Sequence, residues 1–207
     1  MRSEDRKPDK LTQIPVVGGW TALTRAAIGG HVEVCQLLLE NKCNKDITQD
    51  RGYTALMSAA SGGHVEVCRL LLENKCNKDI TDEYGRTALM FAASRGHVEV
   101  CQLLLENKCH KDITDSDGST ALHLAAEWGQ LQTTRCLVEE AGISPLVKTH
   151  KGKTPYDLAA SMKQGQYKEV MEYLKIDDTL TSSGTNTVSK VDDTITSGGT
   201  KYSLLGR

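Results

Sequence analysis

A unit of 33 residues recurs four times in succession, and this repetition constrains the fold more than any other feature of the chain. The copies begin at Gly19, Gly52, Gly85 and Gly118, and a more divergent fifth copy begins at Gly152. A fixed period of this length indicates a solenoid, because each unit holds too little apolar core to fold alone and must stack on its neighbours. Proteins built this way usually present surfaces to partners, and catalysis is uncommon among them.

Each unit predicts two helices followed by a turn-rich loop. In the second copy, the alanine-rich run 54–60 predicts a short first helix, and residues 64–74 carry apolar side chains at helical spacing. Gly62 and Gly63 between these runs favour a tight reversal of the chain. The segment 79–85 ends in a glycine that can adopt positive φ, which is typical of a β-hairpin loop. A threonine stands at the expected N-cap of every first helix, at positions Thr21, Thr54, Thr87, Thr120 and Thr154.

These elements resemble the ankyrin-repeat family. The matching motifs in the second copy are T-A-L-x-x-A-A-x-x-G-H at 54–64, V-E-V-C-x-L-L-L-E at 65–73 and D-x-x-G at 82–85. The resemblance covers about residues 19–175, and five tandem matches make chance an inadequate explanation. It implies an all-α solenoid of about five repeats, each a helix-turn-helix with a β-hairpin loop.

Lysine stands at three points where the family usually has glycine after the second helix, and each of these lysines follows an asparagine. Because a left-handed backbone is strained for lysine, we expect the asparagine to take the left-handed position instead. The pairs concerned are Asn41–Lys42, Asn74–Lys75 and Asn107–Lys108.

Composition and charge bound the domain organisation and the cellular setting. We expect a charged N-terminal segment or partial cap at 1–18, a repeat domain at 19–175, and a disordered tail rich in Ser, Thr, Gly and Asp at 176–207. The net charge of −2 gives no electrostatic case for nucleic acid. No apolar run is long enough to span a membrane, and no signal peptide is evident. An intracellular location is therefore expected, in the cytoplasm and also the nucleus.

Seven cysteines invite a disulfide or metal interpretation, which the repeat disfavours. Equivalent points on adjacent repeats lie about 8–10 Å apart, which is beyond the reach of a disulfide. His31 and Cys35, like their copies, have the spacing of a helical metal pair, but two ligands per repeat complete no tetrahedral zinc site. Cysteine also behaves as a small hydrophobic residue. We therefore expect buried, reduced thiols with no metal and no cofactor.

Motifs for catalysis or ion binding are also missing from the sequence. The run 112–118 resembles a calcium loop, but its alignment puts Ile113 at the first ligand position and Leu124 at the final glutamate position. No phosphate loop, dinucleotide fingerprint or nucleophile elbow is present. The single-repeat candidates His123, His150 and Cys136 have no base–nucleophile spacing, so an enzyme is disfavoured.

The first three repeats are nearly identical, so their differences mark the positions that the scaffold leaves free. These positions cluster beside the hairpin and on the first helix, which in ankyrin proteins form a concave partner-binding face. They are rich in Trp, Tyr and Arg, the residues typical of interface hot spots, although neutral drift would also vary free positions. The candidate partner-binding residues are Trp20, Arg51, Tyr53, Ser61, Glu83, Tyr84, Arg86, Phe91, Ser94, Arg95, Ser119, Glu127, Trp128, His150 and Lys153.

The leading interpretation is a non-catalytic scaffold or adaptor that binds an unidentified protein partner and is itself monomeric. Four members of the candidate face are expected to point away from the stacked core, so that truncating any one to alanine leaves the melting temperature nearly unchanged: Tyr84, Arg86, Arg95 and Trp128. The alternative is a structural role, as a self-assembling solenoid or a module of a larger complex. It rests on the outer side of the first repeat, which exposes Val and Leu unless Leu11, Ile14, Val16 and Val17 cover it as an irregular cap.

Overall fold

The computed structural model describes residues 20–162 and 166–175. The chain divides into two units, residues 1–175 and 176–207, and every described residue belongs to the first unit. The expectations for the segments 1–18 and 176–207 therefore lie outside the described residues.

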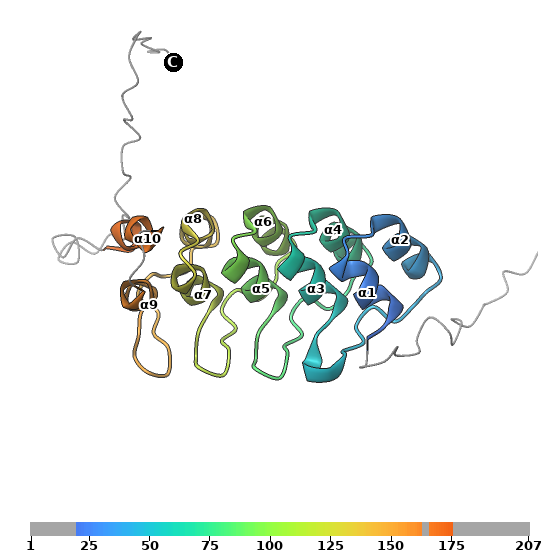
Figure 1. Ribbon diagram of the computed structural model, residues 1–207, viewed down its shortest axis with the longest axis horizontal. Coiled ribbons are helices and arrows are strands. Elements are labelled where there is room, and N and C mark those ends of the chain that lie inside the picture. The colour runs from blue at the N-terminus through green and yellow to red at the C-terminus, as the bar shows by residue number, and fades with distance from the viewer. Residues whose placement is uncertain (1–19, 163–165, 176–207) are drawn as a thin grey trace, which may run out of the picture. The chain divides into compact units, whose positions relative to one another are not determined.

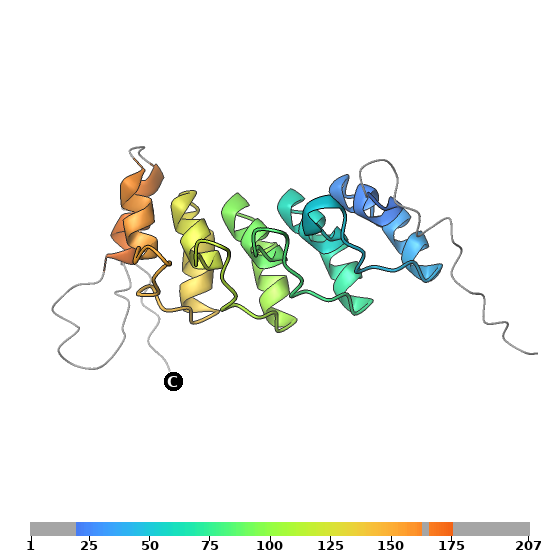
Figure 2. The same cartoon turned by 90° about the horizontal axis from the view of Figure 1, so that it is seen from below.

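The described residues contain ten α-helices in five successive pairs (Figure 1). The odd-numbered helices (the first helices) lie in one row, and the even-numbered helices (the second helices) lie in a parallel row beside them (Figures 1 and 2). Each helix packs against its partner and against the equivalent helix of the neighbouring repeat. The helices are α1 (Ala22–Ile28), α2 (Val32–Glu40), α3 (Ala55–Gly62), α4 (Val65–Glu73), α5 (Ala88–Arg95), α6 (Val98–Glu106), α7 (Ala121–Glu127), α8 (Leu131–Glu139), α9 (Pro155–Ser161) and α10 (Gln166–Leu174).

The loops that join one pair to the next hold very little regular structure. A short 3₁₀ helix, η2 (Asp50–Gly52), lies in the loop before α3. Across residues 20–162 and 166–175 no β-strand is assigned, and Trp20 alone forms an isolated bridge. The predicted hairpin loops are thus turns rather than strand ladders, and the predicted all-helical repeat solenoid is confirmed.

Four of the five predicted threonine caps are confirmed, whereas the Thr120 hydroxyl is paired with His123 Nδ1 at 3.0 Å instead. The Thr54 hydroxyl accepts a hydrogen bond from the backbone N–H of Met57 at 3.2 Å, and Thr87 accepts one from Met90 at 3.4 Å. Such bonds satisfy a backbone donor that the first turn of a helix leaves without a partner. Thr21 and Thr154 make the same contact in repeats 1 and 5.

The prediction that asparagine takes the left-handed position after each second helix is wrong. Asn74 keeps φ at −78°, whereas Lys75 adopts φ of 60°. The reason is the asparagine side chain, whose Nδ2 donates to the Leu70 carbonyl at 2.9 Å and so holds Asn74 against the last helical turn. The reversal therefore falls on the next, exposed residue, whose N–H donates to the Leu72 carbonyl at 2.8 Å. The same geometry recurs at Asn41–Lys42 and Asn107–Lys108.

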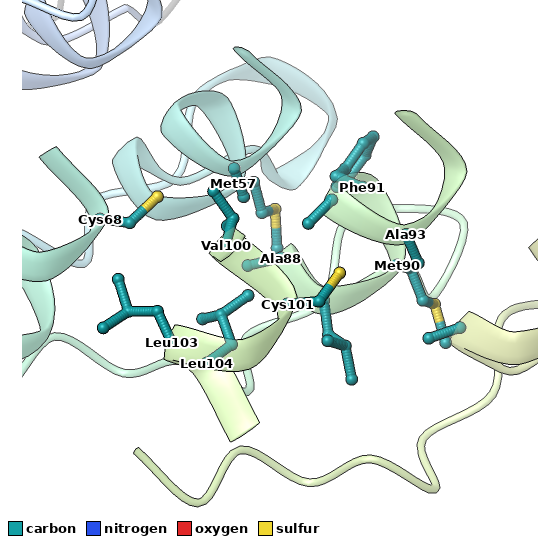
Figure 3. Packing of buried hydrophobic residues seen from close by; sticks show 14 of the residues in the cluster. Met57, Cys68, Ala88, Met90, Phe91, Ala93, Val100, Cys101, Leu103 and Leu104 are labelled. Carbon is teal, nitrogen blue, oxygen red and sulfur yellow. The ribbon is translucent and has the colours of Figure 1, made fainter. Parts of the chain in front are cut away.

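The core lies between the stacked pairs and is built from small and branched side chains (Figure 3). Ala59 and Ala92 on the first helices are completely buried, as are Val100 and Leu104 on α6. The cysteines belong to this core, since six of the seven are buried and all are free thiols. Burial raises the pKa of the Cys68 thiol to about 12, so it stays protonated and unreactive at neutral pH. The prediction of cysteine as a small hydrophobic residue is confirmed.

Candidate partner-binding face

Four loops between successive helix pairs project away from the second helices, beneath the row of first helices in Figure 1. We call them finger loops 41–54, 74–87, 107–120 and 140–154, and we call the surface that they form with the first helices the finger face. Adjacent finger loops are joined at their tips by one backbone hydrogen bond each. The N–H groups of Glu83, Ser116 and His150 donate to the carbonyls of Arg51, Tyr84 and Asp117 at 2.9–3.0 Å.

One carboxylate organises the finger loop 74–87. Asp82 Oδ1 accepts from the backbone N–H groups of Tyr84 at 3.0 Å and Arg86 at 2.8 Å, which closes the turn. Asp82 Oδ2 accepts from Nε and Nη2 of Arg86 at 2.9 and 2.8 Å. The Asp82 side chain is 0% exposed and that of Arg86 is 31% exposed. Burial alone lowers the pKa of the Arg86 guanidinium, but the hydrogen bond and charge of Asp82 outweigh it and raise that pKa.

Arg86 also lies among three aromatic rings. Its guanidinium carbon is 4.7 Å from the ring centroid of Phe91, 5.0 Å from that of Tyr84 and 6.0 Å from that of Tyr53. Its Nη2 donates to the Tyr53 hydroxyl at 2.8 Å, and the Tyr53 and Phe91 rings are themselves 5.2 Å apart. Such stacking adds cation–π attraction to the ion pair. The expectation that Arg86 points away from the folded core is therefore wrong, because Arg86 holds two finger loops and helix α5 together.

The fifteen candidate residues differ widely in accessibility. Tyr84 is 46% exposed and Trp128 is 57% exposed, whereas Phe91 is 8% exposed and Ser119 is 6% exposed. Phe91 packs under Arg86 and Ser119 donates its N–H to Asp115 Oδ1 at 2.8 Å, so both act within the fold. The exposed members are Arg51, Glu83, Tyr84, Arg95, Trp128, His150 and Lys153, and the half-buried ones are Trp20, Tyr53, Ser61, Arg86, Ser94 and Glu127.

At the first repeat, two basic residues of the face are held by neighbours. The guanidinium carbon of Arg25 lies 5.0 Å from the centroid of the Trp20 ring, and Arg51 Nε lies 3.6 Å from Glu83 Oε1. The Arg51–Glu83 pair is exposed, so it contributes little to stability. These contacts orient the side chains along the face without burying them.

The fourth repeat gives the face a different electrostatic character. Burial raises the pKa of Glu127 at the end of α7, and the negative charges of Asp115 and Asp117 raise it further. Lys151 Nζ lies 3.2 Å from Asp117 Oδ1, but both groups are exposed. The exposed Trp128 follows directly at the C-cap of α7. This end of the face therefore combines excess negative charge with an accessible aromatic ring.

Sequence reasoning missed the finger-loop carboxylates Asp82 and Asp115. Both stand in the recurring D-x-x-G motif, whose glycine predicts the positive φ of the turn but whose aspartate closes the turn by accepting backbone N–H bonds. Ile28, a variable position at the end of α1 that is not among the fifteen candidates, is also accessible, with 43% exposure.

The histidines of the repeat join neighbouring repeats. His64 Nε2 lies 2.9 Å from the carbonyl oxygen of Ile28, and His97 Nε2 lies 3.1 Å from that of Ser61. Because a carbonyl only accepts, each Nε2 must carry the hydrogen. In repeat 4, Gln130 Nε2 donates to the Ser94 carbonyl at 3.4 Å in the same way.

His123, one of the single-repeat candidates for chemistry, is completely buried. Its Nε2 donates to the Lys153 carbonyl at 3.1 Å and its Nδ1 accepts from the Thr120 N–H at 3.2 Å. Burial lowers the pKa of His123, and its ring serves as a cap and an inter-repeat link. Among residues 20–162 and 166–175, no three His, Cys, Asp or Glu side chains are grouped to hold a metal ion.

A family model described as ankyrin repeats (3 copies) matches the chain at residues 4–82, 41–115, 74–149 and 108–182. The chain belongs to the ankyrin-repeat family. Ankyrin repeats are generally protein–protein interaction modules, and the family is typically non-catalytic. A search of curated proteins finds no match to this ankyrin-repeat protein. Within the described residues, none of the helices combines the length and apolar character that crossing a membrane requires.

Proposed function

We propose that this ankyrin-repeat protein is a non-catalytic scaffold or adaptor that binds a partner protein on its finger face. The observation that carries the proposal is the exposure of large aromatic and cationic side chains on repeats 3 and 4. Tyr84 and Trp128 are about half exposed, at 46% and 57%, and Arg95 is exposed between them in sequence. Aromatic and arginine side chains of this kind dominate the binding energy of protein interfaces.

The second-helix side offers a useful contrast. Gln36 is exposed, and its Nε2 donates to Oε1 of Glu40 on the same helix at 2.9 Å. Arg69 Nε lies 3.7 Å from Oε1 of Glu66, again on the same helix. These side chains are polar and engaged within one helix, so they present no aromatic anchor. Partner binding is accordingly assigned to the finger face, with the ankyrin domain at 19–175 as the binding unit. The protein is proposed to act inside the cell as a monomer, without nucleic acid, cofactor or metal.

The test compares captured proteins across matched variants. The full chain is immobilised as wild type, as Tyr84→Ala, Arg95→Ala and Trp128→Ala, and as the controls Gln36→Ala and Arg69→Ala. Proteins captured from a cell extract are quantified by mass spectrometry, and the Kd of each candidate partner is then measured by calorimetry. We expect at least one finger-face change to weaken binding by about 2 kcal/mol, roughly thirtyfold in Kd, while the controls leave it unchanged.

Arg95→Ala and Trp128→Ala should keep their thermal stability, because exposed side chains without buried partners contribute within about 0.5 kcal/mol. Tyr84→Ala also removes the ring that lies 5.0 Å from the Arg86 guanidinium carbon, so it should lower stability by up to about 1 kcal/mol. Arg86 is left out of this set, since its removal also disturbs Asp82. A partner whose Kd responds to Gln36 and Arg69 but not to the three finger-face residues would place the binding site on the second helices and overturn the proposal.

A further inference from the structure

Among residues 20–162 and 166–175, no second helix precedes α2, so its outer side lacks the preceding neighbour that each later second helix has. Within the part of the chain that the structure describes, α4 packs between α2 and α6, whereas the main contacts of α2 are with α1 and α4, and α2 ends the row of second helices in Figure 1. Val34 of α2 is 48% exposed, while its counterparts Val67 and Val100 are 0% exposed. Leu37 is 60% exposed, while its counterparts are less exposed: Leu70 is half-buried and Leu103 is 5% exposed. We call Val34 and Leu37 the open face of α2.

The open face carries the same residue types that the next two repeats bury in the core or against it. In repeats 2 and 3, the same valine and leucine positions belong to the hydrophobic core, with Val67, Val100 and Leu103 buried and Leu70 partly buried against it. The open face therefore keeps the side chains of a repeat interface without the repeat that would cover them. Large exposed apolar groups of this kind mark a site that another segment or molecule covers.

The residues directly before the first repeat have the composition to cover it. The sequence from 1 to 10, MRSEDRKPDK, is charged throughout, and it changes at residue 11 to LTQIPVV. This run ends three residues before Trp20, where the described structure begins. Helix α2 has nine residues and is thus about 13 Å long. Seven extended residues reach about 23 Å, so the run can cross the whole open face.

Charge on α2 favours this segment over a second copy of the chain. The helix carries Glu33 and Glu40 and no basic residue. A two-fold pairing of open faces would bring these glutamates of two molecules together, and like charges at an interface are unfavourable. Residues 1–10 instead carry four basic and three acidic side chains, and Lys10 stands next to the apolar run. An attached segment also acts at an effective concentration near millimolar, which a second molecule reaches only in concentrated solution.

We propose that residues 11–17 cover the open face of α2 through Leu11, Ile14, Val16 and Val17, as an intramolecular cap on the first repeat. Pro15 restricts Ile14 to extended backbone, so the cap is an extended segment and not a helix. The cap is independent of partner binding on the finger face, and each can be tested without the other.

A double-mutant cycle in the full chain tests the cap. One variant carries Ile14→Ser and Val17→Ser, the second carries Val34→Ser and Leu37→Ser, and the third carries all four changes. Urea unfolding gives the equilibrium constant of each. We expect each pair of changes to raise the unfolding constant about tenfold, and the quadruple variant to be no less stable than the second variant, because both pairs remove the same contact.

Leu146→Ser is the matched control, since Leu146 is 56% exposed on a finger loop of the fourth repeat. It should add independently to the Ile14→Ser and Val17→Ser changes. Additive effects of the two test pairs, within twofold in the unfolding constant, would show that the segment does not contact the open face and would overturn the proposal.

Amide hydrogen exchange and mass measurement complete the test. The backbone amides of Ile14, Val16 and Val17 should exchange more slowly in the wild type than in the Val34→Ser and Leu37→Ser variant, because that variant loses the cap. Wild-type mass in sedimentation should stay that of one chain as concentration rises. A mass that doubles with concentration, and that returns to one chain when Val34 and Leu37 are changed, would assign the open face to a second copy instead.

Discussion

The finger loops 74–87 and 107–120 share one backbone and differ in one decisive side chain. In both, the aspartate Oδ1 accepts N–H bonds from residues two and four positions later, at 3.0 and 2.8 Å. In both, a glycine adopts φ near 78°. The fourth residue after the aspartate is Arg86 in one loop and Ser119 in the other. Aspartate and glycine therefore determine the turn, and the variable position determines the surface.

The difference changes the electrostatics of the whole repeat. Arg86 neutralises the charge of Asp82, and the Asp82 side chain is 0% exposed. Ser119 brings no charge, so Asp115 stays half-buried and negative, and its field contributes to raising the pKa of Glu127. The loop 74–87 thus contains an ion pair that packs against aromatic rings, whereas the loop 107–120 presents an acidic patch.

The largest expected loss of stability comes from substituting the glycine that both loops share. This substitution tests whether the loops need the same backbone conformation. A Cβ on Gly118 would lie 2.6 Å from the backbone nitrogen of His150 in the next loop. Gly152 has a similar φ of 72° but no atom within 4 Å of its Cβ position. We expect Gly118→Ala to destabilise the protein by about 3 kcal/mol, from backbone strain and overpacking together. Gly152→Ala should cost only the strain, about 1 kcal/mol.

Urea unfolding of the two alanine variants measures this difference directly. Equal losses at Gly118 and Gly152 would mean that backbone strain alone accounts for the glycines and that the stacking of finger loops imposes no further constraint.

The next effect in size concerns the residue in which the loops differ. Arg86→Ala leaves the buried Asp82 carboxylate without its counterion and should destabilise the protein by about 2 kcal/mol. This figure lies below that for a fully buried pair because Arg86 is partly exposed and screened by solvent. Ser119→Ala, at the equivalent position, should change the free energy of unfolding by less than about 0.5 kcal/mol. Thermal and urea unfolding of both variants check the comparison.

A charge-removing second change separates lost ion pairing from lost packing. Combining Asp82→Asn with Arg86→Ala removes the orphaned charge while keeping an oxygen for the backbone bonds of the turn. Recovery of part of the lost stability supports the ion pair as the main term, whereas a further loss would assign the effect to Arg86 packing on Tyr53 and Phe91.

The same two loops show what the sequence predicts well and what it does not. The fold could be predicted because it rests on periodicity, on the threonine caps and on the D-x-x-G turn, all of which are local patterns. The state of Arg86 could not, because it depends on Tyr53 from the preceding loop and on Phe91 from the following helix. A variable arginine looks the same in sequence whether it faces a partner or bridges two repeats.

The lysines after the second helices show a second limit of sequence-based reasoning. Propensity favours asparagine for the left-handed position, but the Asn74 side chain donates to the Leu70 carbonyl and the residue keeps a negative φ of −78° as the C-cap of α4. Intrinsic preference was thus outweighed by one hydrogen bond of the helix end. Residues of the candidate face differ in burial because local contacts decide it. Phe91 and Ser119 stand at variable positions, yet their neighbours bury them.

The smallest expected effect follows from the acidic loop. A carboxyl group with a raised folded-state pKa binds its proton more tightly in the native protein than in the unfolded chain. Its contribution to stability is therefore lost as pH rises from the ordinary glutamate value of 4.5 through the raised pKa of Glu127. Glu127→Gln should consequently stabilise the protein at pH 7, by less than about 1 kcal/mol because the site is partly solvated. Below about pH 4 that advantage should vanish, since the native glutamate is then neutral as well.

Thermal unfolding at pH 7 and below pH 4 measures the change. Asp117→Asn is the companion variant, and it should also stabilise the protein at pH 7 by removing one of the two neighbouring charges. If Glu127→Gln stabilised the protein equally at low pH, the gain would come from packing of the amide. It would then not come from relief of the repulsion between Glu127 and the carboxylates of the loop 107–120.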